Sequence, residues 1–383
     1  CPGYVFGGVE MQEYLKKYKM TIQAVSPIFI GSGEKIGKKE YIYMPWNQHV
    51  IIPDLQKMYA GLEKKKLASE YEAFMMDSRN NQMPISNWLG QNGFKEQDYR
   101  RWSKYEMDAG EAFQSKTNRP KEIEAFVKDA YGMPYVPGSS IKGMLRTALM
   151  VREILLQTDK YQDAGNRIKE GATRNNHRYL LQETKKLEQE IFYHLKRMEG
   201  DKKQSNAVND CMAGILVGDS DPLSLEELTL SQKVDVTLDG KRKPLPLLWE
   251  TLIPGKKIQF DLVIDTELSP YSVEDIMDAI DLFQGLSNQY FYDRFGRTIT
   301  DDYAVFLGGG CGYVSKTVMY ALFGDDAVPI IDKVYKMTLG KNYYVHKHGR
   351  DIGLNIAPHV CKCTVYRGKL YDMGIGKLTY EEI

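Results

Sequence analysis

The sequence predicts an α+β fold with a ferredoxin-like (split βαβ) core, and three observations support this class. Strand patterns alternate with helix patterns along the chain. The connections between them are short turns in some places and long insertions in others. With 383 residues, of which 43% are hydrophobic, the chain can bury a substantial core and still carry insertions.

The first part of the chain is predicted to form an N-terminal portion, residues 19–238, with two helical insertions. Residues 20–30 alternate as a strand. Residues 54–130 place apolar residues at helical spacing, and residues 158–205 are rich in Lys, Glu, Gln, Asn and Arg, which predicts a polar helical insertion. Residues 1–18 start without methionine or a signal-peptide pattern and are predicted to be an N-terminal extension or a cloning remnant.

Residues 239–383 are predicted to form a C-terminal portion with a glycine-rich loop. A helix is expected to begin at Ser272, because Ser272 and Asp275 have the spacing of a capping box before an apolar stripe. Apolar or alternating stretches also predict strands at 213–217, 228–238 (a strand or projecting hairpin), 257–265 and 302–307.

Composition and charge narrow the functional classes. The chain has 51 basic and 51 acidic residues, so its net charge is zero and any contact with nucleic acid must come from local patches. Its five cysteines are scattered apart from Cys361 and Cys363, which is typical of free thiols in a reducing cytoplasm. No segment reaches the ~20 apolar residues of a membrane span. We therefore expect a cytoplasmic protein that binds no membrane.

The most informative stretch is a glycine run that follows an apolar strand pattern: Gly308, Gly309, Gly310 and Gly312, with Lys316 in the next predicted helix. Glycines let backbone amides approach an anion, and a helix start and an ammonium add a positive field. A nucleotide-hydrolysing P-loop needs lysine directly after its last glycine, whereas Lys316 lies four positions beyond Gly312. The run therefore predicts a phosphate-binding loop of another type, or a glycine turn that only packs a strand against a helix.

A second motif, residues 135–146, predicts the start of a helix. Pro137 and Gly138 signal a turn, Ser139 or Ser140 is suited to cap the helix, and an apolar stripe follows. One face of this helix then carries a hydroxyl, an ammonium and a guanidinium, which suits a polyanion. A glycine inside the helix costs about 1 kcal/mol relative to alanine, and close approach of another backbone would explain it. The residues concerned are Ser139, Lys142, Gly143 and Arg146.

Together the two motifs resemble the RAMP superfamily of type III CRISPR effectors, whose signature is a Pro-Gly-Ser-Ser-Ile-Lys-Gly-x-x-Arg helix start with a late glycine-rich loop. Residues 137–146 match the helix start, and residues 306–317 match the loop. Residues 25–33 and 218–221 are similar to the first strand and loop and to the end of the middle strand of the family. Their order and spacing over residues 19–320 are most similar to the terminal subunits of type III-A effectors, the fifth Csm proteins.

This resemblance implies an RRM-like ferredoxin core and a subunit that has no catalytic residues, cofactor or metal. It implies binding of CRISPR RNA, capping of the backbone filament at the guide 3′ end and assistance in guide maturation. The expected partners are CRISPR RNA, the neighbouring backbone RAMP subunit, the small helical subunit of the Csm complex and trimming nucleases. In these relatives the glycine loop packs beside the first helix, so both motifs would share one RNA-facing surface. The implied RNA-binding residues are Ser139, Ser140, Lys142, Arg146, Gly308, Gly309, Gly310, Gly312 and Lys316.

The loop after the first strand, residues 31–40, argues against catalysis. In related backbone subunits that cut target RNA the resemblance would place a catalytic aspartate in this loop, and here the loop contains none. Its lysines suit backbone phosphates, although a solvated charged turn explains them equally well. Candidate phosphate contacts are Ser32, Lys35, Lys38, Lys39 and, in a later loop similar to one of the family, Arg119.

Other patterns leave alternatives open. Residues 335–350 interleave cations with tyrosine and histidine, which suits single-stranded RNA, although an ordinary packed strand explains the same pattern. His359, Cys361 and Cys363 would share one strand face, yet they lack the spacing of a zinc site, so we expect buried cysteines and no metal.

The resemblance also leaves rival functions. One is a metal-independent RAMP endoribonuclease that processes CRISPR RNA with a histidine as general acid or base, although neither glycine motif contains any of the six histidines. Another is a nucleotide-binding domain built on the glycine loop. A third is an interaction scaffold whose contact with RNA is incidental.

Overall fold

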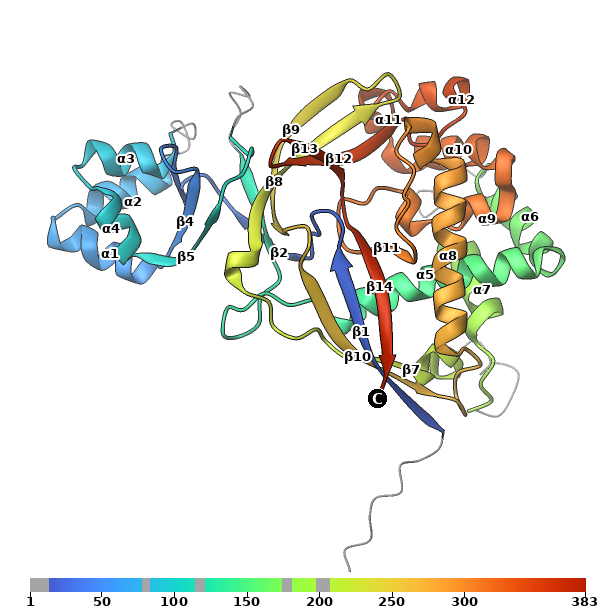
Figure 1. The fold of residues 1–383 in the computed structure, drawn as a ribbon. Helices are drawn as coiled ribbons and strands as arrows, with labels where there is room; N and C mark the ends of the chain where they lie inside the picture. Colours follow the sequence, from blue (N-terminus) through green and yellow to red (C-terminus); the bar gives the residue numbers. More distant parts are fainter. Residues whose placement is uncertain (1–13, 78–82, 114–120, 174–180, 198–206) are drawn as a thin grey trace, which may run out of the picture.

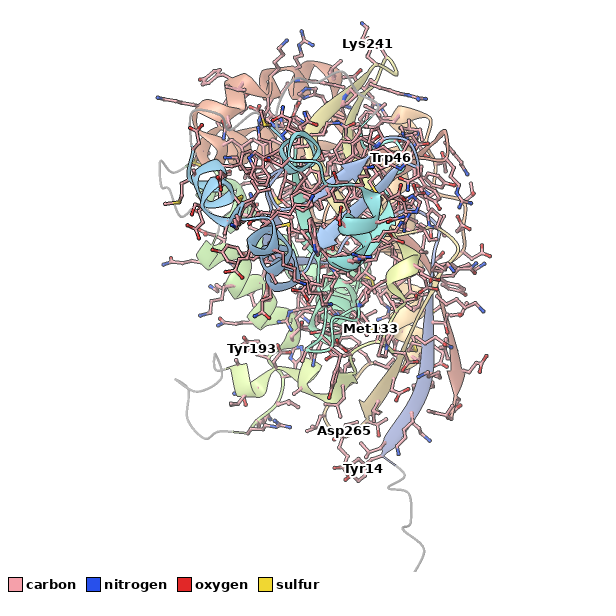
Figure 2. The ribbon with its side chains drawn as sticks, turned by 90° about the vertical axis from the view of Figure 1, so that its left-hand side faces the viewer. Tyr14, Trp46, Met133, Tyr193, Lys241 and Asp265 are labelled. Atoms are coloured by element: carbon pink, nitrogen blue, oxygen red, sulfur yellow. The ribbon has the colours of Figure 1, made fainter. Side chains whose placement is uncertain are left out.

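The computed structural model describes residues 14–77, 83–113, 121–173, 181–197 and 207–383, which form a main body and a helical lobe (Figure 1). Figure 2 shows that Tyr14 and Asp265 lie near one end of the molecule and Lys241 at the other. Within the described ranges, no helix combines the length and apolarity that crossing a bilayer requires.

A five-stranded sheet lies at the centre of the main body. All its neighbouring strands are antiparallel, and their order is β11, β14, β1, β10, β7. The bounds are β1 (Leu15–Ala24), β7 (Ile215–Val217), β10 (Lys257–Asp265), β11 (Ala304–Phe306) and β14 (Ile375–Glu382).

The connectivity of this sheet agrees with the predicted class. β1, α5 (Gly138–Leu156), β7, β10, α8 (Val273–Tyr290) and β14 follow one another as β-α-β-β-α-β, which is the ferredoxin-like arrangement. β10 lies between the parallel strands β1 and β7, as a split βαβ unit requires. β11 and the glycine run are then an insertion before the last core strand, at one edge of the sheet.

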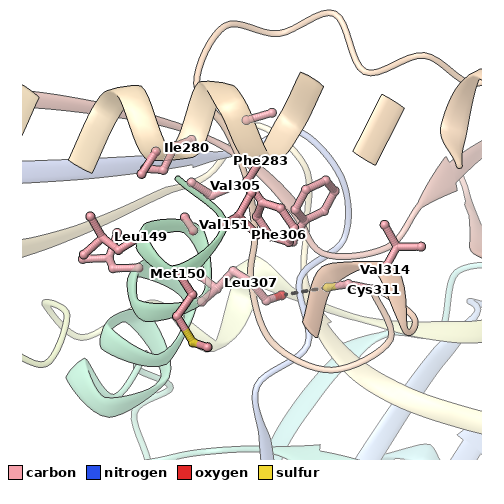
Figure 3. Packing of buried hydrophobic residues seen from close by; sticks show 14 of the residues in the cluster. Leu149, Met150, Val151, Ile280, Phe283, Val305, Phe306, Leu307, Cys311 and Val314 are labelled. Atoms are coloured by element: carbon pink, nitrogen blue, oxygen red, sulfur yellow. Dashed lines mark hydrogen bonds between the residues drawn. The ribbon is translucent and has the colours of Figure 1, made fainter. Parts of the chain in front are cut away.

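One face of the sheet packs against α5 and α8. Alternate residues of β1 are buried, which follows from the period of two along a strand. Figure 3 shows Leu149 of α5 and Ile280 of α8 on either side of Val305 in β11. α8 begins as predicted, because Ser272 Oγ accepts the Asp275 amide at 3.1 Å and the Asp275 carboxylate accepts the Ser272 amide at 2.9 Å.

A second sheet of nine strands extends from the main body toward the helical lobe (Figure 1). Its main path runs β2, β6, β9, β8, β5, β4, β3, with β12 pairing to β8 and β13 to β12. The bounds are β2 (Gly31–Ile36), β3 (Ile42–Met44), β4 (His49–Pro53), β5 (Ser103–Asp108), β6 (Glu122–Phe126), β8 (Leu228–Thr237), β9 (Arg242–Leu252), β12 (Val360–Tyr366) and β13 (Lys369–Asp372).

The first predicted insertion forms the lobe and then returns to the sheet. Its helices are α1 (Leu55–Lys64), α2 (Ala68–Met76), α3 (Ile85–Gln91) and α4 (Glu96–Arg101), and they bury a separate aromatic core that includes Trp88 and Trp102. The prediction of helix to residue 130 is wrong beyond Arg101, because β5 and β6 pair there with β4 and β9.

The second predicted insertion is largely helical in its described residues, 158–173 and 181–197, as expected. It contains α6 (Gln162–Gly171) and α7 (Leu181–Phe192). Ile168 and Leu187 are fully buried in the main core, so these helices are packed parts of the domain and not only a solvated appendage.

Residues 335–350 form helices, which corrects the strand considered for them. The segment between β11 and β12 holds α9 (Met319–Phe323), α10 (Ala327–Leu339), α11 (Lys341–Val345) and α12 (Asp351–Leu354). The helix expected at Lys316 is also shorter than predicted, since Val314–Lys316 is one 3₁₀ turn and α9 starts three residues later.

The two predicted portions are interleaved in space. The boundary at 238/239 falls in the turn between the paired strands β8 and β9, and β1 pairs with β14 across the whole chain. At the N-terminus, β1 begins at Leu15, inside the segment expected as an extension.

Candidate nucleic-acid interface

The glycine run leaves the edge strand β11 as an irregular loop. Gly308, Gly310 and Gly312 have φ of 84°, 87° and 84°, a left-handed conformation that favours glycine. In the described part of the chain the amides of these three glycines donate to no protein acceptor, whereas Gly309 donates to the Phe29 carbonyl at 2.8 Å. Neighbouring backbone N–H groups that have no acceptor within the protein can together bind an anion.

The same glycines are also required by packing. A Cβ on Gly308 would lie 2.1 Å from the Phe29 carbonyl oxygen, and one on Gly310 would lie 2.5 Å from the Trp249 ring. Phe29 and Trp249 stack with centroids 4.9 Å apart. The interpretation as a packing turn is therefore correct for Gly308, Gly309 and Gly310, and it is compatible with the free amides of Gly308 and Gly310.

Three cations surround this loop. Lys316 is exposed and has no ion-pair partner among the described residues. Lys233 of β8 lies 5.4 Å from the Trp249 ring centroid, and desolvation lowers its pKa. Lys362 of β12 approaches Gly312, but Asp235 neutralises it at 2.8 Å. Lys316 and Lys233 are thus the cations available to a ligand here.

The first turn of α5 differs from its prediction. The helix begins at Gly138 after Pro137, and neither Ser139 nor Ser140 caps it through its side chain. The Asp219 carboxylate instead accepts the Gly138 amide at 2.7 Å. An anionic group of the protein therefore already occupies the start of this helix, and phosphate binding cannot rely on that amide.

The two cations of this motif have different environments. Arg146 donates to Asp210 at 2.7 Å and lies 3.4 Å from Glu188, with its guanidinium 4.3 Å from the Phe192 ring. Its charge is paired within the protein, so a phosphate at this position would compete with Asp210. Lys142 is half-buried and makes no hydrogen bond or ion pair in the described ranges. Desolvation lowers the pKa of Lys142.

Gly143 does not have the close neighbour that was expected. Apart from the adjoining residues and backbone of its own helix, no atom of the described residues would lie within 4 Å of a Cβ at this exposed position, whereas a Cβ on Gly138 would lie 2.3 Å from the Val217 carbonyl oxygen. Gly138 is the close-approach glycine of this helix.

Gly143→Ala is therefore expected to stabilise the isolated protein by up to about 1 kcal/mol, because alanine favours a helix interior. Thermal unfolding of the purified chain measures the change. Gly138→Ala is the matched control and should lower the melting temperature. A lower melting temperature for Gly143→Ala would contradict the open environment.

The two motifs lie near each other without touching. Gly309 bonds to Phe29, the Val127 amide bonds to the Ile30 carbonyl at 2.8 Å, and the Tyr135 amide bonds to the Val127 carbonyl at 3.4 Å. These backbone hydrogen bonds connect the glycine loop, through residues 29–30 and 127, to the segment that leads into α5. Met150 in the second half of α5 lies beside Leu307 (Figure 3). The expected packing of loop against helix thus holds for the second half of α5, not for its first turn.

The remaining predicted contacts are mostly engaged within the protein. The Ser32 hydroxyl donates to the Ala125 carbonyl at 3.1 Å, and Lys35 lies 3.9 Å from Glu122 on the surface. Lys39 is buried and donates to the Phe74 carbonyl at the end of α2 at 2.7 Å, and Lys38 is buried too. Of the three lysines only Lys35 is exposed, and Ser32 is exposed as well. Arg119 lies outside the described residues.

Sequence reasoning missed Lys233, Phe29 and Trp249, which border the glycine loop. Their only signal was aromatic and basic character in strands distant along the chain, and pairing of β8 with β9 brings Lys233 and Trp249 together.

Two clusters of possible metal ligands occur among the described residues. Asp351 accepts His348 Nδ1 at 2.9 Å and His359 Nδ1 at 2.5 Å. Cys361 and Cys363 lie 3.0 and 3.5 Å from Asp372, which Arg297 also binds at 2.8 Å. The cysteines are buried as predicted, but His359 joins His348 and Asp351 and not the cysteines.

Comparison with known proteins identifies the relatives of this chain. Residues 21–315 match the family described as the RAMP superfamily. The CRISPR system Cms protein Csm5 of Mycobacterium tuberculosis is 31% identical over 95% of this chain and 97% of its own length. Csm5 of Streptococcus thermophilus is 29% identical over 80% of this chain and 82% of its own.

Two solved structures share the fold. A chain in a cryo-EM structure of a Csm-crRNA-target RNA ternary complex from a type III-A CRISPR-Cas system superposes with a TM-score of 0.62 at 18% identity, covering 94% of this chain and 100% of that chain. Crystalline Csm5 of T. onnurineus gives 0.59 at 16% identity, covering 93% and 99%. The resemblance of the two motifs and the full-length relatives agree: this chain belongs to the RAMP superfamily and, within it, to the Csm5 proteins of CRISPR systems.

Proposed function

We propose that this chain is a non-catalytic subunit of a type III-A interference complex that binds CRISPR RNA through its backbone. The observation that carries the proposal is the glycine loop, where three left-handed glycines have amides without protein acceptors beside the exposed Lys316. Amides and an ammonium bind phosphate oxygens without reading bases. The relatives named Csm5, and the fold shared with a chain of a Csm-crRNA-target RNA complex, support RNA as the ligand.

In this proposal the glycine loop, Lys316 and Lys233 form one part of the interface, and Lys142 forms the other. One extended single strand of RNA would cross both parts. Arg146 acts as a structural residue that holds α5 to Asp210. The chain works in the cytoplasm at the guide 3′ end, where it caps the backbone RAMP filament and assists guide maturation.

The absence of catalysis is part of the proposal. Residues 31–40 contain no aspartate, and the only acidic side chains there are Glu34 and Glu40. Glu40 accepts the Gly37 amide at 2.6 Å, so it is committed to the turn. Incubating the chain with precursor RNA should leave the RNA intact, and cleavage that disappears on replacing one histidine would favour the endoribonuclease instead.

The salt dependence of RNA binding tests the contacts. Fluorescence anisotropy with a repeat-derived single-stranded RNA, measured over a range of salt concentrations, gives the slope of log K against log salt. Each lost phosphate contact lowers the magnitude of this slope by about 0.7, so Lys142→Ala with Lys316→Ala should lower it by about 1.4.

Two controls accompany this test. Arg146→Ala should leave the slope unchanged while it destabilises the fold, since its partners are Asp210 and Glu188. Lys64→Ala, an exposed lysine on the helical lobe, should change neither. An unaltered slope in the double variant, or an equal fall in Lys64→Ala, would overturn the assigned interface.

The capping role has its own assay. Adding the chain to a complex of CRISPR RNA and the other subunits should protect the guide 3′ end from a single-strand-specific exonuclease. If only the 5′ end of the guide is protected, the chain does not cap the 3′ end. The proposal that the chain binds RNA would still stand.

A further inference from the structure

His348, Asp351 and His359 form a compact group that is connected to the glycine loop through the rings of Tyr335 and Tyr313. His348 lies in the 3₁₀ turn His348–Arg350, Asp351 is the first residue of α12, and His359 immediately precedes β12. The Asp351 side chain is fully buried, and each imidazole is 10% exposed. Its two carboxylate oxygens each face the Nδ1 of a different histidine.

The buried carboxylate needs a positive counterpart, since an isolated charge in the interior is costly. No lysine or arginine pairs with Asp351 in the described part of the chain, where its ion-pair partners are these two histidines. Lys362, on the adjacent strand, is already neutralised by Asp235 at 2.8 Å. A cation must therefore come from a protonated imidazole or from a bound metal ion.

The donor set is that of a borderline transition metal. Imidazole nitrogens and carboxylate oxygens are ligands of Zn²⁺, and three protein ligands with one open position are a common arrangement. One ligand atom from each of the three residues lies within 4.8 Å of the others, close enough for small side-chain rotations to bring them around one ion. His346, whose ring is 6.0 Å from that of His348, is exposed, so this side is open to solvent.

The second cluster lacks these properties. Arg297 binds both oxygens of Asp372, at 2.8 and 2.9 Å, and so already supplies the positive charge. Cys361 and Cys363 are at most 1% exposed and lie beside this neutralised carboxylate. The cysteine cluster is therefore a control for the histidine cluster within the same protein.

From this geometry we propose that His348, Asp351 and His359 form a Zn²⁺ site with water as the fourth ligand. The ion takes the place of the Nδ1 hydrogens that face Asp351: a neutral imidazole moves its proton to Nε2, and a protonated imidazole releases one proton to solvent. The site ties α12 and the preceding turn to the start of β12. Because Lys362 of β12 contacts Gly312, the metal also fixes one wall of the glycine loop.

The experiment uses the full chain after dialysis against a chelator. Titration with Zn²⁺ by calorimetry, and with Co²⁺ followed by its ligand-field absorption, should give one saturable site of tetrahedral type. Zn²⁺ should raise the melting temperature, and a chelator should reverse this. A chain that binds no Zn²⁺ with saturation overturns the proposal.

Variants locate the ion. His359→Asn and His348→Asn each keep a donor facing Asp351 but remove an imidazole ligand, and each should weaken Zn²⁺ binding by about tenfold or more. A variant with Cys361→Ser and Cys363→Ser is the matched control and should bind as tightly as the parent. Loss of binding in the cysteine variant with retention in both histidine variants would place the ion at Asp372 and overturn the assignment. If a variant fails to fold, the number of Zn²⁺ ions bound by each unaltered chain still tests the proposal.

Discussion

Gly308→Ala is expected to unfold the glycine loop and to abolish RNA binding by the full-length chain. The substituted Cβ would lie 2.1 Å from the Phe29 carbonyl oxygen, and the backbone φ of 84° is unfavourable for alanine. Strained backbone and overpacking each cost about 1–3 kcal/mol, so their sum is about 2–6 kcal/mol. Moving the loop to relieve the contact would break the hydrogen bond between Gly309 and Phe29.

Gly312→Ala is the matched control for this variant. Gly312 has the same φ of 84°, but its nearest neighbour would be the flexible Lys362 Cγ at 3.4 Å. Gly312→Ala should therefore lose only about 1 kcal/mol of stability, which is the cost of a left-handed backbone for alanine. The variant should keep much of its affinity for RNA. Chemical unfolding and anisotropy of both variants measure the difference. Equal losses of stability would contradict the close approach of Gly308 to Phe29.

Glu250→Ala is expected to cause the second large loss, because Glu250 is a fully buried charge with three partners. Its carboxylate accepts Lys128 Nζ at 2.5 Å, the Tyr105 hydroxyl at 2.6 Å and the Phe126 amide at 2.8 Å. Burial, together with the charge of Glu250, raises the pKa of Tyr105 well above its usual range. Removing the carboxylate leaves the Lys128 ammonium uncompensated, which costs about 3–5 kcal/mol.

Glu250→Ala should also weaken RNA binding. Residues 126–128 connect the glycine loop to the segment before α5, because Val127 hydrogen-bonds to both Ile30 and Tyr135. Urea unfolding and anisotropy measure the two effects. Glu250→Gln with Lys128→Met removes both charges at similar volume and should recover much of the stability lost in Glu250→Ala. A loss below about 1 kcal/mol in Glu250→Ala would contradict the role of this ion pair.

Sequence patterns predicted the elements whose causes are local. The capping box at Ser272 starts α8 because its two partners are three residues apart. The alternating strand at residues 257–265 is β10, with the predicted bounds. Helices were predicted correctly in the described residues 158–173 and 181–197, where a composition rich in Lys, Glu, Gln, Asn and Arg indicated a polar helical insertion.

Contacts between distant residues explain what the sequence could not show. Arg146 has the position of a phosphate ligand in the motif, yet its partner Asp210 is 64 residues away. The Asp219 carboxylate occupies the start of α5 from 81 residues away. The short strands β5 and β6 form because β4 and β9 pair with them, so their own patterns gave little indication. No pattern in the sequence indicated that Asp351 accepts a hydrogen bond from each of two histidines.

The central pairing of β1 with β14 sets the order in which this protein can mature on the ribosome. Ala24 pairs with Gly376, so the ferredoxin-like core stays incomplete until more than 350 further residues have been synthesised. Such distant pairing slows folding and leaves unsatisfied strand edges exposed to aggregation. Expression at low temperature, or translation in the presence of chaperones that shield exposed strands, should therefore increase the soluble yield.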